Sequence, residues 1–220
     1  MVSLQSNKMV KVLLMRHSES VYNAIQTQYQ VENNIDDEKY EHTPYRWIIN
    51  DRIIDALLSP KGEQQSYNAT EVLNNYPNIK YVWVSPLRRA FFTATKALEN
   101  YKFKENIQKY IVNPNIKEVA WSNCDMGVCT KELIKEYPEF DWSCMNQFEN
   151  PIIWFLEVIN EAGDPENLEL KHKLIAAWKK DPQVKTLLDI LEPEFPLRAE
   201  GEKSIQARVM LAKEQVKEFC

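Results

Sequence analysis

The sequence lacks an apolar run long enough to cross a membrane, since its longest candidate, residues 152–156, is soon followed by Glu157 and Asn160. It also lacks a leader pattern, because the first ten residues contain neither the long apolar core of a secretory signal nor the arginines of a transit peptide. These two absences predict a protein with no membrane partner and, by default, a cytoplasmic location.

Cysteine is scarce as well. The four cysteines, at positions 124, 129, 144 and 220, form neither the paired spacing of a zinc site nor the dense framework of a disulfide scaffold. The formal net charge is -5, so the chain lacks the overall positive charge typical of proteins that bind nucleic acid. We therefore expect reduced thiols, no nucleic-acid partner, and anion binding only at a local site.

What the sequence does contain is an alternation of strand and helix patterns. Short β-branched and apolar runs at residues 10–15, 81–84 and 110–112 predict buried strands. Helical composition at residues 62–73 and 88–98 follows the first and second of these runs. This alternation predicts an α/β fold with a mostly parallel, doubly wound sheet flanked by helices.

Two long segments interrupt the alternation. Residues 26–50 are polar, and residues 119–197 are rich in aromatic residues and proline. Within the second segment, the aromatic residues of 124–143 are expected in the core rather than as a substrate platform. We expect both segments to be insertions that lie over the C-terminal edge of the strands and cover a site. Residues 202–219 predict a final amphipathic helix, and residues 1–220 are expected to form a single domain.

Charged residues follow the ends of all three predicted strands. Arg16 and His17 follow the first strand, Arg89 follows the second, and Glu118 follows the third. Ligands of open α/β sheets bind beyond the carboxyl ends of the strands. An arginine can bind phosphate oxygens, an imidazole can attack phosphorus, and a glutamate can protonate a leaving oxygen. Each residue alone would equally fit a solvated surface, but together they predict a phosphate pocket.

Four segments resemble, in the right order, the landmarks of the histidine phosphatase superfamily, the phosphoglycerate-mutase-like proteins. Residues 13–20 are similar to its Arg-His-Gly signature, with Ser18 in place of glycine. The other matching segments are residues 55–65, 85–94 and 201–208. Residues 124–143 resemble the phosphatase branch, and the long segment after Asn23 argues against mutase activity.

The resemblance implies a phosphomonoester hydrolase acting through a phosphohistidine, and it assigns six residues to the site. They are the catalytic residues His17, Arg16, Arg89 and Glu118, and the substrate-binding residues Asn23 and Ser18. Asp141 is the second choice for the proton donor, although its surroundings are more typical of a turn cap.

The chemistry that the resemblance implies needs no metal or cofactor. An attacking His17 must be unprotonated at the nitrogen that meets phosphorus, so its other ring nitrogen is expected to donate to a backbone carbonyl. The partner would be a phosphorylated small molecule or a phosphoprotein.

One feature of the family is missing, namely a second histidine on a strand that follows the last helix. The chain stops at Cys220, while His42 and His172 lie in hydrophilic stretches. An alternative is therefore a catalytically inactive protein that serves as a phosphate-binding or interaction module. Because the missing strand pairs beside the first one, we expect a C-terminal segment beyond Cys220, or a protein partner, to complete the sheet.

Overall fold

The computed structural model describes residues 11–36, 53–119, 123–127, 130–148, 154–158, 165–182 and 202–219. Residues 37–50 of the first expected insertion, which include His42, lie outside these described residues. Several parts of the second expected insertion also lie outside them. The two insertions and the single-domain organisation therefore stay predictions.

Two parallel strands form the sheet within the described part of the chain. Strand β1 (Tyr81–Val84) pairs with β2 (Lys109–Val112), and the register places Tyr81 opposite Lys109 and Val84 opposite Val112. Helix α5 (Arg88–Glu99) lies between them in the sequence, as a parallel crossover requires. The α/β class and the parallel pairing are confirmed, whereas the doubly wound arrangement stays a prediction.

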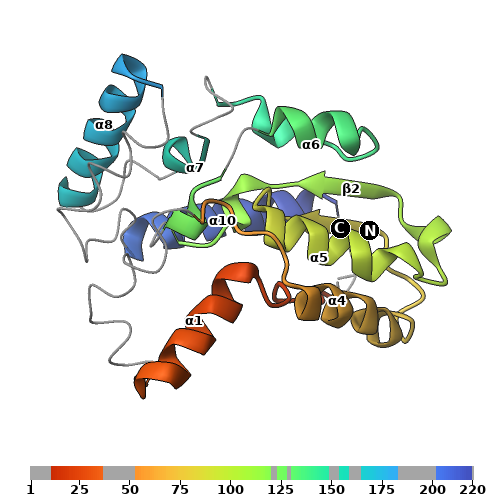
Figure 1. The fold of residues 1–220 in the computed structure, drawn as a ribbon. Coiled ribbons are helices and arrows are strands. Elements are labelled where there is room, and N and C mark those ends of the chain that lie inside the picture. The colour runs from red at the N-terminus through yellow and green to blue at the C-terminus, as the bar shows by residue number, and fades with distance from the viewer. Residues whose placement is uncertain are drawn as a thin grey trace, which may run out of the picture.

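Helix α4 (Pro60–Leu73) packs beside α5. Its start follows from local sequence, because Ser59 accepts a hydrogen bond from Gly62 N and Pro60 occupies the first turn. Figure 1 shows α4 and α5 side by side below the strands, with α6 above β2 and α10 behind. The remaining elements are α1 (Val21–Asn33), η1 (Lys104–Asn106), η2 (Pro114–Ile116), η3 (Asn123–Asp125), α6 (Lys131–Glu136), η4 (Ser143–Met145), α7 (Trp154–Glu157), α8 (Pro165–Lys180) and α10 (Glu202–Glu218).

The main core is built on one face of α5. The ring of Phe91 is fully buried and stacks on Trp142 at a centroid distance of 5.7 Å, with Tyr137 and Phe140 also against it. Trp154 is fully buried in the same cluster. Tyr137, Phe140 and Trp142 therefore belong to the core, as expected from the sequence for the aromatic residues of 124–143.

The expected first strand differs from the structure. Residues 11–15 are not a strand, and the side chains of Val12 and Leu14 are 60% and 94% exposed rather than buried. A strand requires a hydrogen-bonded neighbour. Among the described residues, no backbone hydrogen bond joins residues 11–15 to another segment. The segment therefore has no partner strand among them, although its apolar residues favour a strand.

A cavity of about 1290 Å³ separates this segment from β1. Residues 11–17 line it together with all four residues of β1. Phe219, at the end of α10, also lines the cavity and packs edge-on against Tyr81 and Trp83. Since β1 pairs with β2 alone in the described sheet, its other edge is available at this cavity. No helix among the described residues is both long and apolar enough to span a membrane.

Candidate active site

His17 lies at the end of the exposed N-terminal segment, partly buried. Its Nδ1 is 2.7 Å from the carbonyl oxygen of Ser18, and because a carbonyl oxygen only accepts, Nδ1 carries the proton. In the neutral ring Nε2 then holds the lone pair. The expected backbone partner of the imidazole is thus present, and Nε2 is the nitrogen available for attack.

The surroundings of His17 favour its neutral form. Burial is the largest cause that lowers the pKa of His17, and the nearby Arg89 and Arg16 lower it further. The hydrogen bond to Ser18 and the carboxylate of Glu118 act in the opposite direction, but the net shift is downward. The imidazole is therefore unprotonated in the neutral pH range.

Arg89 reaches His17 from the first turn of α5. Its Nε donates to Nε2 of His17 at 3.3 Å, while Arg88 points instead toward Glu132, at 4.0 Å. The side chain of Arg89 is buried and still lines the cavity. The structure therefore brings together the arginine and the histidine that the resemblance selected, although they are 72 positions apart.

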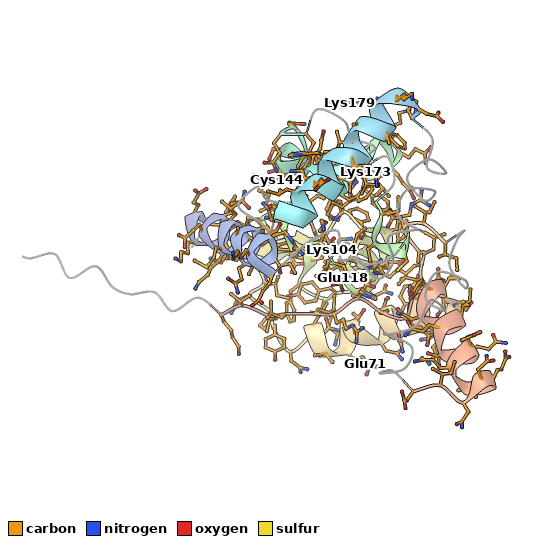
Figure 2. All side chains as sticks on the ribbon, turned by 90° about the vertical axis from the view of Figure 1, so that its left-hand side faces the viewer. Glu71, Lys104, Glu118, Cys144, Lys173 and Lys179 are labelled. Carbon is orange, nitrogen blue, oxygen red and sulfur yellow. The ribbon has the colours of Figure 1, made fainter. Side chains whose placement is uncertain are left out.

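Arg16 and Glu118 line the same cavity as His17 and Arg89. Arg16 is exposed, and no described residue forms an ion pair with it. Glu118 is also exposed, and its Oε1 accepts a hydrogen bond from Val119 N at 2.8 Å. In the view of Figure 2, Glu118 projects near the centre, whereas Lys179 lies at the edge, on α8.

Helix α10 supports the loop that carries Glu118. Nη1 of Arg208 donates to the carbonyls of Asn115 and Lys117, at 2.7 and 2.8 Å, and the Arg208 side chain is buried. Asn113 Nδ2 also donates to Gln215 of the same helix. Helix α10, which corresponds to the last motif of the resemblance, thus holds the backbone directly before the candidate proton donor Glu118.

Ser18 and Asn23 do not line the cavity. Ser18 N donates to Thr93 Oγ1 of α5, and its hydroxyl accepts from Ser66 of α4. Asn23 forms a capping box with Ser20 at the start of α1. In the structure, the contacts of Ser18 and Asn23 hold the loop after His17 in place. Their contact with a substrate stays a prediction.

A close approach of α4 fixes the same loop. A Cβ on Gly62 would lie 1.9 Å from the carbonyl oxygen of Glu19, so glycine is required there. Ser59 N donates to that oxygen at 3.0 Å, and the Glu19 carboxylate binds the Ser59 hydroxyl and Lys61 Nζ. These contacts connect residues 18–20 rigidly to the first turn of the helix.

Sequence reasoning missed the role of Asp55. Its carboxylate accepts from Arg88 N at 2.8 Å and so caps α5, whose own N-cap residue, Leu87, has no capping side chain. Asp55 is buried and has φ of 44°, a left-handed conformation in which Asp and Asn are the tolerated non-glycine residues. A cap of this kind comes from a distant segment and leaves no local sequence signal.

Sequence reasoning assigned η3 to the segment that resembles the phosphatase branch, but it missed the contact of η3 with Arg89. Nη2 of Arg89 donates to Asp125 Oδ1 at 2.8 Å, and Nη1 donates to the Cys124 carbonyl at 2.6 Å. The second-choice proton donor, Asp141, instead accepts from Ser143 N and pairs with Lys109, as a turn cap does. His172 is exposed on α8 and does not line the cavity. Within the described part of the chain, no three His, Cys, Asp or Glu side chains gather as a metal site.

Comparisons with known proteins bear on the family of this chain. The sequence profile of the histidine phosphatase superfamily (branch 1) matches residues 46–158, which include Arg89, Glu118 and Asp125 but not His17. A protein of Schizosaccharomyces pombe named as a probable phosphatase is 26% identical over 131 residues. That alignment spans 59% of this chain and 59% of the relative's length.

Proposed function

Because the chain belongs to the histidine phosphatase superfamily (branch 1), we propose that it hydrolyses phosphomonoesters through a phosphohistidine formed on Nε2 of His17. The family and a relative named as a probable phosphatase support phosphatase activity in general. The observation that supports the phosphohistidine mechanism is the protonation pattern of the His17 ring. Its proton lies on Nδ1 against the Ser18 carbonyl, so the lone pair of Nε2 faces the cavity residue Arg89.

The proposed reaction has two balanced steps. In the first, Nε2 of His17 forms a bond to phosphorus while the phosphorus–oxygen ester bond breaks, and protonated Glu118 gives its proton to the leaving oxygen. In the second, a water molecule attacks phosphorus, the phosphorus–nitrogen bond breaks, and Glu118 takes back a proton. Inorganic phosphate leaves and the imidazole is restored.

Arg16 and Arg89 supply the electrostatic part of this proposal. Phosphoryl transfer leaves negative charge on the equatorial oxygens, and guanidinium groups fixed beforehand stabilise that charge without reorganisation. Both arginines line the cavity that contains His17. The substrate class follows as a phosphorylated small molecule or phosphoprotein, and the proposed location is the cytoplasm.

We propose in addition that a β-strand from polypeptide outside the described residues completes the sheet. The apolar side chains of residues 12–15 are exposed, the second edge of β1 is unpaired in the described sheet, and the cavity lies between the two. An extended strand inserted there would bury these side chains and pair with both backbones.

The test of the catalytic proposal is a covalent intermediate. We expect the protein, incubated with a ³²P-labelled phosphomonoester and quenched, to carry acid-labile label, and His17→Ala to carry none. His172→Ala is the matched control, since it removes an exposed imidazole on α8 and should leave the label unchanged. Label that persists in His17→Ala would exclude His17 as the nucleophile.

A further inference from the structure

Arg89 is fixed by more than its contact with His17. A guanidinium has five N–H donors, and three of those in Arg89 are engaged, by His17 Nε2, the Cys124 carbonyl and Asp125 Oδ1. One N–H remains on each terminal nitrogen. The orientation of these two remaining donors is therefore set by His17 and by η3, and no residue of η3 itself lines the cavity.

The contact with Asp125 is a buried ion pair. The side chains of Arg89 and Asp125 are only 4% and 6% exposed. Burial is the largest influence on the pKa of Arg89 and lowers it, but Asp125, Cys124 and Asp55 together more than offset burial, and the net shift is upward. Arg89 is thus a charged group whose charge is balanced within the protein.

The two arginines of the site therefore contribute differently to the binding of an oxyanion. Arg16 is exposed and has no ion-pair partner among the described residues, so it contributes uncompensated positive charge. Arg89 contributes fixed donors, while Asp125 beside it is an anion close to an anion site. If charge alone governed binding, Asp125 would weaken it.

We propose that Asp125 is a positioning residue, which holds the guanidinium of Arg89 against His17 so that its two remaining N–H groups bind an oxyanion. This proposal rests on the proposed function and names a residue that acts only through Arg89. A planar fork of donors binds phosphate well only when its orientation is fixed.

The test is the affinity for inorganic phosphate, measured from the ring NMR signals of His17 in the folded protein, whose chemical shifts differ from those of unfolded chains. We expect Asp125→Asn, which keeps the size of the side chain but removes its charge, to weaken phosphate binding by about tenfold, the equivalent of one hydrogen bond to a charged group. Unchanged or tighter binding would overturn the proposal, because that is the outcome expected from charge alone. Asp141→Asn is the matched control and should bind as the unmodified protein does, since it also breaks an ion pair, but one whose cation, Lys109, does not line the cavity.

A double-mutant cycle separates positioning from general stability. In the Arg89→Ala background, Asp125→Asn is expected to cause no further loss of phosphate affinity, because Asp125 has nothing left to position. The same tenfold loss in that background would overturn the proposal. Failure of the unmodified protein to bind phosphate would overturn the proposed function and this inference with it. Binding that is weakened by Arg89→Ala but not by Asp125→Asn would overturn the inference alone.

Discussion

Nε of Arg89 and Nε2 of His17 lie 3.3 Å apart, and this contact joins the start of α5 to the loop after the exposed N-terminal segment. The hydrogen bond uses the lone pair with which His17 would attack phosphorus. Arg89 therefore favours the neutral tautomer that is protonated on Nδ1 before a substrate arrives. The hydrogen bond from Arg89 to Nε2 must break when Nε2 bonds to phosphorus.

The first prediction concerns the acid limit of activity. Protonation of His17 removes the nucleophile, and burial lowers its pKa, so kcat/KM should fall only at a pH below the ordinary value for histidine, about 6.5. A pH–rate profile checks this. A profile that already falls above pH 6.5 would contradict a neutral, buried His17.

The same shift has a consequence for stability. A histidine with a lowered pKa takes up a proton more readily in the unfolded chain, so its contribution to stability is complete above about pH 6.5 and is lost as the pH falls toward its lowered value. Urea unfolding of the unmodified protein and of His17→Asn, compared at pH 7.5 and 5.5, should show a smaller pH dependence in the variant.

The second prediction separates the two arginines by salt. Arg16→Gln should weaken phosphate binding and reduce its dependence on ionic strength, because Arg16 is exposed and supplies uncompensated charge. Asp125→Asn should weaken binding while leaving the salt dependence in place. Phosphate titrations at two salt concentrations measure the affinity and its salt dependence for each variant. The control is Arg88→Gln, which removes a charge that is directed toward Glu132.

The third prediction concerns the cap that Asp55 provides to α5. Asp55→Ala should lower the free energy of unfolding by about 0.5–2 kcal/mol through loss of the cap, with an added cost because alanine tolerates φ of 44° poorly. Asp55→Asn keeps both an acceptor and the tolerance of this conformation, so it should lose much less. Equal losses in the two variants, measured by denaturant unfolding, would contradict a capping role.

The fourth prediction tests the proposed additional strand. In the 220-residue chain, the backbone amides of residues 12–15 should exchange with solvent within the dead time of a hydrogen-exchange experiment, since no described backbone group accepts from them. A strand inserted beside β1 should protect them together with Tyr81 and Trp83, whose backbone groups point away from β2 because those of Val84 point toward it. Protection of residues 12–15 without protection of β1 would place the strand elsewhere.

The sequence by itself determined the elements that depend on local patterns. Helix α4 follows from Ser59 and Pro60, β1 from a short apolar run, and α5 from the residues after Ser85. The family also followed from short motifs in order along the chain, and it is confirmed by a profile match that begins beyond His17. In each case the information lies within a few consecutive residues.

Tertiary structure decided the rest, because the groups concerned meet only when distant segments pack. The apolar pattern of residues 11–15 predicts a strand, but a strand forms only beside a partner, and the described residues supply none. Asp55 caps a helix that begins 33 positions later, and Asp125 pairs with an arginine 36 positions before it. Both aspartates lie in segments that resemble the family, but the sequence does not show which partner folding brings to each of them.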